Sequence, residues 1–376
     1  MPGLLPNIDP DGLLEYSVVY TDRSLNHMSH SFQNVMKEVS ASLKNVYNAE
    51  AVVLVPGGGT YAMEAVARQF ATDKSCLVLR NGWFSYRWSQ ILEMGDIPSE
   101  QEVLKASKIN DGSQAPFAPA DVNEVVNQIK SQKPAMVFAP HVETSAGIIL
   151  PDDYIQTVVE AVHSVGGMFV LDCIASGAIW IDMEKLGVDI LVSAPQKGWS
   201  ASPSFGMVML SSSASKKIHE TKSTSYSCDL LKWLQIMQAY ENGGHAYHAT
   251  MPTDAIKHFR DTINETAEFG FDNARQKQQE LGDRVRGLLR KYNFISVAAD
   301  GFLAPGVVVS YTSDKEIHNG SKFKDMGMQI AAGVPLKCNE GDDYQTFRLG
   351  LFGLDKLKDI DAAVGRLEVA FKQLMA

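Results

Sequence analysis

Short apolar runs alternate with helix-like segments between about residues 50 and 215. Six runs are continuous and rich in aliphatic residues, as expected of strands buried on both faces: AVVLV, CLVLR, AMVFA, GMFVLD, DILVSA and GMVMLS. Stretches such as YAMEAVARQF and DDYIQTVVEAVHSV separate them. This alternation is typical of βαβ units, and it predicts an α/β protein whose mainly parallel sheet has helices on both faces.

The pattern changes after about residue 255, where the sequence becomes helical and charged as far as about residue 292. Three strand-like runs follow, FISVAAD, GVVVSYT and FRLGLFG, and the chain ends in an amphipathic helix over 360–374. We therefore expect three parts: an N-terminal arm over residues 1–15, a large domain over 16–268 and a smaller α+β domain over 269–376.

Composition narrows the classes of function. The formal net charge is −10, and clustered Lys and Arg of the kind that binds nucleic acid or anionic membranes are missing. The N-terminus does not resemble a signal peptide, and no apolar stretch reaches the roughly 18 residues of a membrane span. The four cysteines have no CxxC or Cys/His spacing. We expect a cytoplasmic protein that binds no nucleic acid, membrane or metal.

Asp172 closes the run GMFVLD, and Lys197 follows the run VDILVSA. Both therefore lie at the carboxyl ends of central strands, the edge at which open α/β sheets bind ligands. A lysine that loses solvation becomes able to form a Schiff base with an aldehyde, and a buried carboxylate needs a cationic partner. Pyridoxal phosphate offers an aldehyde, a protonated pyridine and a phosphate in one molecule. The alternative is that Asp172 caps a turn and Lys197 is a solvated loop residue.

A glycine-rich loop lies between a predicted strand and a predicted helix in AVVLVPGGGTYAMEAVARQF. Backbone N–H groups at a helix N-terminus bind phosphate, and glycines allow the backbone to approach it closely. The loop matches neither GxGxxG nor GxxxxGKS, so it does not indicate a dinucleotide or a nucleoside triphosphate. A tight turn without a ligand is the alternative interpretation.

Seven short motifs extend this pattern along the chain: PGGGTYAMEA, NGWFSYR, PHVETSAG, LDCIAS, SAPQKG, YHATMP and FRLGLFG. In this order they resemble fold-type I pyridoxal-phosphate enzymes, and more narrowly the class V aminotransferases of the alanine:glyoxylate or serine:pyruvate type. The resemblance runs from about residue 30 to the C-terminus. It implies pyridoxal 5'-phosphate as cofactor, a large domain with a mainly parallel seven-stranded sheet between helices, and a smaller C-terminal α+β domain.

The resemblance also implies roles for residues around the cofactor ring. Lys197 would hold the cofactor as a Schiff base and move a proton during catalysis, and Asp172 would keep the pyridine nitrogen protonated. An aromatic residue of NGWFSYR would stack on the ring; this is Phe84, or Trp83 if the register shifts by one. Two further residues would lie close to the ring, Thr144 and Ile174.

A second group of residues matches the phosphate ligands of the family. On the chain's own side these are the Gly58 backbone, Gly59, Thr60 and Gln196. Tyr247 and Thr250 of YHAT match residues that reach the phosphate of the neighbouring subunit. The resemblance therefore implies a homodimer with shared active sites.

Arg348 in FRLGLFG matches the arginine that binds the substrate α-carboxylate. A planar guanidinium binds a carboxylate bidentately, which fixes the Cα–H bond relative to the ring. Asp342 and Asp343 precede it closely and are alternative partners for its charge. The segment before residue 30, NIDPDGLLEYSVVYTDRSLNHMS, departs from the GPGP-type start of the relatives, so the family pattern leaves substrate choice open here.

These features predict an aminotransferase that moves an amino group from a small L-amino acid, such as alanine or serine, to a 2-oxo acid such as glyoxylate or pyruvate. A ping-pong mechanism would follow, because the first product leaves before the acceptor enters. One alternative is a lyase or desulfurase of the same fold, for which Cys338 is a candidate loop cysteine. Another is a ligand-sensing module that retains the fold without turnover.

Overall fold

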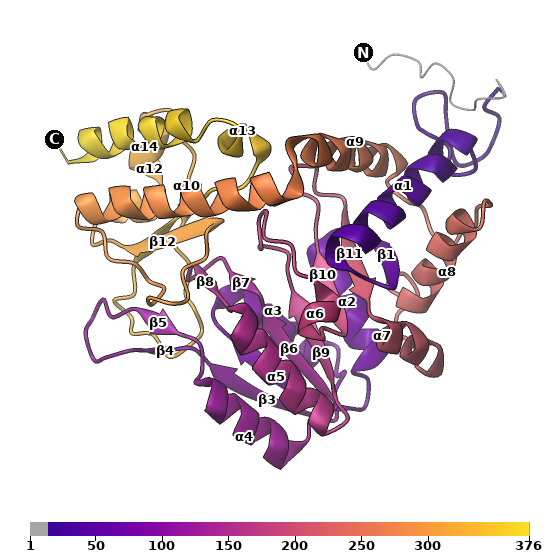
Figure 1. Cartoon of the computed structure of the whole chain (residues 1–376), viewed down its shortest axis with the longest axis horizontal. Coiled ribbons are helices and arrows are strands. Elements are labelled where there is room, and N and C mark those ends of the chain that lie inside the picture. The colour runs from indigo at the N-terminus through magenta and orange to yellow at the C-terminus, as the bar shows by residue number, and fades with distance from the viewer. Residues whose placement is uncertain (1–13, 376) are drawn as a thin grey trace.

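The computed structural model describes residues 14–375 and has a seven-stranded sheet at its centre (Figure 1). Strand β11 runs antiparallel to both of its neighbours, whereas the other neighbouring strands pair in parallel. The predicted mainly parallel α/β sheet is thereby confirmed. In spatial order the strands are β1 (Ala51–Pro56), β11 (Phe205–Leu210), β10 (Ile190–Ser193), β9 (Met168–Asp172), β6 (Met136–Pro140), β2 (Ser75–Arg80) and β3 (Glu100–Lys105).

Six of these strands are the six apolar runs, and their burial explains why. Every residue of β9 after Met168, and every residue of β10, is buried. Strand β3 was not predicted, because EQEVLK is largely polar; two of its residues are exposed and the other four are half-buried. It forms one edge of the sheet and needs an apolar surface on one side only.

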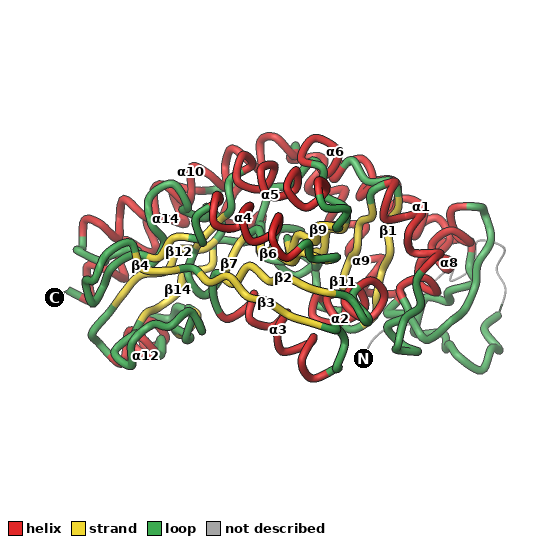
Figure 2. Tube along the Cα trace, turned by 90° about the horizontal axis from the view of Figure 1, so that it is seen from below, coloured by secondary structure: helices red, strands yellow, loops and turns green. Residues whose placement is uncertain are grey.

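Helices cover both faces of the sheet, with α4 and α5 on one side and α2 and α3 on the other (Figure 2). The segments predicted as YAMEAVARQF and DDYIQTVVEAVHSV are α2 and α5. The helices of this part of the chain are α1 (His30–Tyr47), α2 (Gly59–Phe70), α3 (Trp83–Met94), α4 (Val122–Gln132), α5 (Asp152–Ser164), α6 (Met183–Leu186), α7 (Ser212–Lys217), the 3-10 turn η1 (Ile218–Glu220), α8 (Leu230–Glu241) and α9 (Thr253–Phe269).

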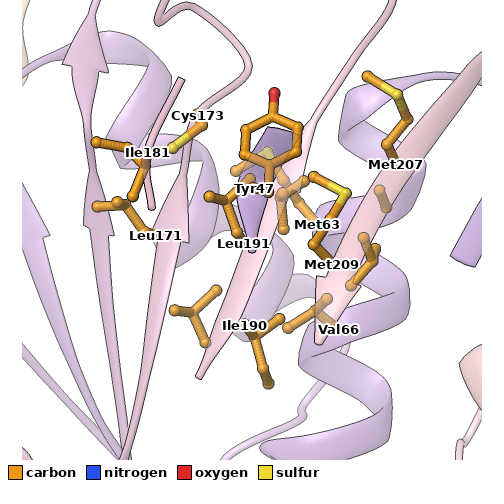
Figure 3. Packing of buried hydrophobic residues seen from close by; sticks show 14 of the residues in the cluster. Tyr47, Met63, Val66, Leu171, Cys173, Ile181, Ile190, Leu191, Met207 and Met209 are labelled. Carbon is orange, nitrogen blue, oxygen red and sulfur yellow. The ribbon is translucent and has the colours of Figure 1, made fainter. Parts of the chain in front are cut away.

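The core between sheet and helices is apolar and continuous. Figure 3 shows Met63 of α2 close to Leu191 of β10 and Met209 of β11. Cys173 is buried in the same cluster beside Leu171, and burial raises the pKa of its thiol well above the ordinary value. It is thus a packing residue, as are the three other cysteines, which are all buried and free.

The C-terminal part has a three-stranded antiparallel sheet with α10 and α14 packed side by side over it (Figure 1). Its elements are α10 (Phe271–Lys291), β12 (Val307–Tyr311), α11 (Lys315–His318), α12 (Ser321–Asp325), β13 (Ala331–Ala332), β14 (Thr346–Gly350), α13 (Leu354–Leu357) and α14 (Ile360–Leu374). Two short hairpins pair β4 (Ser107–Lys108) with β5 (Phe117–Ala118) and β7 (Val142–Glu143) with β8 (Ile148–Ile149).

One expectation for this region needs correction. FISVAAD is not a strand, because Ser296 bridges to Ser310 while Ala298 bridges to Phe117, and single bridges to different partners form no ladder. The predicted helical stretch is confirmed as α9 and α10, between which the chain turns at Gly270, with a φ of 90°. The domain boundary at residue 268 stays a prediction, and most of the predicted arm lies outside the described residues.

Within residues 14–375, no helix is both long and apolar enough to cross a membrane.

Candidate active site

Asp172 is the last residue of β9, and its carboxylate is buried without a cationic partner in the described chain. The side chain is 7% exposed, and Oδ1 accepts one hydrogen bond, from the Ile174 N–H at 2.9 Å. Burial is the main cause that raises the pKa of Asp172 to about 7; the nearby Glu143 acts in the same direction. The site therefore favours either a proton on Asp172 or a bound cation beside it.

Lys197 follows β10, at the same edge of the sheet as Asp172. Its ammonium makes no hydrogen bond or ion pair within residues 14–375, and Nζ lies 5.2 Å from the centroid of the Phe352 ring. Burial lowers the pKa of Lys197, and the positive charge of Arg348 lowers it further. A lysine with a lowered pKa is more often neutral and therefore more nucleophilic.

The glycine loop leaves its backbone open at the start of α2. Gly58 has a φ of 145°, and no atom lies within 4 Å of the position that a Cβ would occupy. A Cβ on Gly59 would lie 2.5 Å from Ile174 Cδ1, so any larger residue there would require the Ile174 side chain to move. Thr60 Oγ1 accepts a hydrogen bond from Arg87 Nη1 at 3.0 Å. Open backbone, a hydroxyl and a cation together suit a phosphate group.

Phe84 is positioned by a buried carboxylate at the start of α3. Glu143 is fully buried; its Oε1 accepts from the Phe84 N–H at 3.2 Å, and its Oε2 accepts from the Ser85 N–H at 2.8 Å. The hydroxyls of Ser85 and Ser145 each donate to it at 2.7 Å. A Cβ on Gly82 would overlap Ser145 Oγ, so the motif requires glycine there. A carboxylate at a helix N-terminus is favoured by the free N–H groups and the helix dipole.

Replacing Glu143 by glutamine is expected to lower the free energy of unfolding by roughly 2–4 kcal/mol, because an amide NH₂ would then face groups that donate hydrogen bonds. Urea unfolding measures this change. Glu160→Gln, on the exposed side of α5, is the control and is expected to change stability by less than about 0.5 kcal/mol. Equal unfolding midpoints for the two variants would mean that Glu143 does not hold α3.

Two arginines flank the Phe84 ring. The guanidinium carbon of Arg87 lies 5.3 Å from the ring centroid, and that of Arg348 lies 5.5 Å from it. Arg348 Nε donates to the Ala332 carbonyl at 2.8 Å, and its terminal nitrogens make no hydrogen bond within the described chain. No ion pair joins Arg348 to Asp342 or Asp343 in this part of the chain, so the alternative partners are not engaged.

In the described chain, the remaining candidate residues make no hydrogen bond or ion pair with Asp172 or Lys197 that would identify their role. Thr144 is buried near Glu143, and Gln196 is exposed beside Lys197. Tyr247 and Thr250 lie in the exposed loop between α8 and α9, where their hydroxyls are 3.2 Å apart. Within residues 14–375, no hydrogen bond or ion pair joins either of them to Asp172 or Lys197.

The unusual segment before residue 30 packs against this loop. The His27 ring centroid lies 5.5 Å from that of Tyr247 and 5.9 Å from that of His245, and the His27 carbonyl accepts a hydrogen bond from the Tyr240 hydroxyl at 2.9 Å. Asn26 donates to Glu15 at 2.6 Å. The segment therefore supports the loop that carries YHAT.

Cys338 does not have the properties of a desulfurase nucleophile. It is 4% exposed, its thiol donates to the Arg80 carbonyl at 3.4 Å, and burial raises its pKa to about 12. A reactive cysteine needs an accessible thiolate. This observation argues against the desulfurase alternative.

The sequence interpretation missed two residues of the site, Arg87 and Glu143. Arg87 is the cation within NGWFSYR. Its presence in a motif that was assigned to the cofactor ring could have indicated a further contact with the cofactor. Glu143 lies within HVETSAG directly before Thr144, but nothing in the sequence indicates that its carboxylate reaches α3.

Comparisons with known proteins identify the family of the chain. The family model described as Aminotransferase class-V matches residues 13–312. The chain is 25% identical over 356 residues to the soluble hydrogenase small subunit of a Synechococcus species, covering 93% of this chain and 88% of that protein. It is 23% identical over 340 residues to the alanine–glyoxylate aminotransferase of Rattus norvegicus, covering 88% and 78%.

The solved structure of an alanine–glyoxylate aminotransferase from a Nostoc species has a TM-score of 0.79 at 21% identity, covering 93% of this chain and 89% of that one. That likeness shows the fold-type I α/β architecture. Fold and family match together define a pyridoxal-phosphate-dependent aminotransferase. Because the family model spans most of the sequence, the chain belongs to the class-V aminotransferases.

Proposed function

We propose that this enzyme transfers an amino group from a small L-amino acid, of the alanine or serine type, to a 2-oxo acid of the glyoxylate or pyruvate type. One observation carries the proposal: Asp172 and Lys197 lie at one edge of the central sheet, Arg348 of β14 is close enough to act electrostatically on Lys197, and none of the three has an ion-pair partner in the described chain. The buried carboxylate of Asp172 suits a cationic ring. The lowered pKa of Lys197 suits reaction with an aldehyde, and the free terminal nitrogens of Arg348 suit a substrate carboxylate.

The residues present fit pyridoxal phosphate. Asp172 would hold the protonated pyridine nitrogen, and Phe84 would stack on the ring, since Phe84 lies between Arg87 and Arg348 whereas the Trp83 ring lies 5.8 Å from Lys337 Nζ. The Gly58 backbone, Gly59, Thr60, Gln196 and Arg87 would surround the phosphate, with Thr144 and Ile174 beside the ring. When bound, the cofactor supplies an electron sink for the electrons of a broken Cα–H bond.

The chain's own groups then have distinct tasks. Arg348 binds the substrate carboxylate through its two terminal nitrogens and thereby orients the Cα–H bond. Lys197 Nζ accepts the proton from Cα, and the lowered pKa of Lys197 favours the neutral amine that this step needs. Glu143 acts through α3, by holding the backbone that carries Phe84. Because one product leaves before the second substrate enters, the kinetics are ping-pong.

The same proposal includes a cytoplasmic homodimer. Tyr247 is 56% exposed and hydrogen-bonds only to Thr250 among the described residues, so both hydroxyls are accessible to a second copy of the chain. The relative from rat is named as an alanine–glyoxylate aminotransferase, which supports small substrates of this kind.

A spectrophotometric screen tests the proposed function. The cofactor-loaded protein is mixed with single amino donors, and the spectrum reports whether the cofactor passes to its amine form. Alanine or serine is expected to convert it, and glyoxylate or pyruvate is expected to restore the starting spectrum. If no donor changes the spectrum, or if ammonia appears without an acceptor, the aminotransferase assignment fails in favour of a binding module or a lyase, respectively.

A further inference from the structure

A polar cavity of about 580 Å³ lies between the carboxyl end of β2 and the loop that precedes β14. Because β2 runs parallel to β6 and β9, the cavity lies at the same edge of the sheet as Asp172, but neither Lys197 nor Asp172 lines it. Three cations line its wall, namely Arg80, Lys105 and Lys337. Its acidic lining residues are Glu340 and Asp342.

No carboxylate of the described chain forms an ion pair with Arg80, and Glu93 acts on its charge only at longer range. Its side chain is 8% exposed, and its Nε is buried without a hydrogen-bond partner. The terminal nitrogens donate to the Lys337 carbonyl at 3.3 Å and to the Ser89 hydroxyl at 2.9 Å, and the guanidinium lies 4.5 Å from the Tyr86 ring centroid. All of these partners are uncharged groups. A buried guanidinium without a carboxylate is costly unless an anion pairs with it.

Glu340 does not compensate this charge, because both of its oxygens are occupied elsewhere. Oε1 accepts from the N–H groups of Leu336 and Lys337 at 2.5 and 2.9 Å, and Oε2 accepts from the Cys338 N–H at 2.8 Å. The carboxylate thus closes the turn that presents Lys337 to the cavity. Asp342 is exposed to solvent. The wall therefore combines one buried cation that has no ion pair with two lysines, of which Lys337 is exposed and Lys105 donates to Asn339 Oδ1 at 2.9 Å.

We propose that this cavity binds a small anion that carries a carboxylate or phosphate group, with Arg80 as the buried anchor and Lys337 and Lys105 at the entrance. Its volume is enough for such a molecule. The anion is either a free ligand or the distal group of a substrate held at Arg348, and the second source rests on the proposed function. Tyr344 lines the cavity and also acts electrostatically on Arg348, so the two places are neighbours.

Isothermal titration of the cofactor-loaded protein with inorganic phosphate, at constant ionic strength and without an amino donor, tests the site without turnover. Saturable binding to one site is expected, and Arg80→Met and Lys337→Gln should each weaken it roughly tenfold or more. Lys337 is exposed, so its variant tests the site even if Arg80→Met does not fold. Lys130→Gln, an exposed lysine of α4, should bind phosphate like the wild type. No saturable binding, or equal binding by the Lys337 and Lys130 variants, overturns the proposal.

Donor kinetics separate the two sources of the anion. If the site holds the distal group of a substrate, Lys337→Gln raises the half-saturating concentration of L-aspartate several-fold and leaves that of alanine unchanged. If the ligand is a free anion, phosphate affinity is the same with and without saturating L-aspartate, and the two donors respond alike. Phosphate binding remains measurable even if no donor is converted, so failure of the proposed function is distinguishable from failure of this site.

Discussion

Lys197→Ala is expected to lower the rate of amino transfer by roughly 10⁴-fold or more, because the variant loses both the nucleophile and the group that moves the proton at the substrate Cα. Single-turnover mixing with alanine measures the half-reaction directly. The fold should survive, since Lys197 makes no hydrogen bond or ion pair in the described chain and its removal leaves no buried partner unsatisfied.

Two controls sharpen this result. Lys130→Gln should keep the wild-type rate, because that lysine is exposed on α4. Addition of methylamine to Lys197→Ala should restore part of the rate if the missing group is a base. A Lys197→Ala protein that still converts alanine at a rate within tenfold of the wild type would remove Lys197 from the mechanism.

Asp172→Asn is expected to slow amino transfer by roughly 10²–10³-fold and, at the same time, to stabilise the cofactor-free protein at neutral pH. Burial raises the pKa of Asp172 to about 7, above the ordinary value of 3.8 for an aspartate side chain. In the folded state the carboxyl therefore favours its proton, and this contribution to stability is present at low pH and lost as the pH rises through 7. Asparagine does not titrate, so the advantage of the variant grows between about pH 4 and pH 7, toward a limit on the order of 4 kcal/mol.

Urea unfolding of the cofactor-free proteins at pH 4.5 and 7.5 measures this effect. Asp189→Asn is the matched comparison: Asp189 is also buried, but it accepts hydrogen bonds from the Phe169 N–H at 2.8 Å and the Ser213 hydroxyl at 2.9 Å. Loss of that charge should destabilise the protein. An Asp172→Asn protein that is less stable than the wild type at pH 7.5, or fully active, would contradict the assigned role.

Periodicity predicted most of the fold, because a central parallel strand is apolar along its whole length. The same criterion failed at β3, whose edge position permits the polar sequence EQEVLK. It failed again at FISVAAD, where an apolar run makes only isolated bridges. An apolar run indicates that a segment is buried. Whether that segment pairs as a strand depends on which other strands lie beside it in the folded protein.

The candidate site was predictable where a residue follows directly from a strand end. Asp172 and Lys197 were predicted in this way, and the motif resemblance added Phe84 and Arg348 as predictions. Glu143 was missed because its role depends on the return of one loop to the start of α3, 58 residues earlier in the chain. Arg80 was missed for a related reason: an arginine at a strand end appears solvated until the loop around residue 337 covers it.

Reductive trapping tests the central claim most directly. The cofactor-loaded protein is treated with borohydride, digested and analysed by mass spectrometry to locate the reduced cofactor. The account predicts that the cofactor mass is found on Lys197 alone and that it is lost in Lys197→Ala. A label on another lysine, or no covalent label on a protein that binds pyridoxal phosphate, would contradict it.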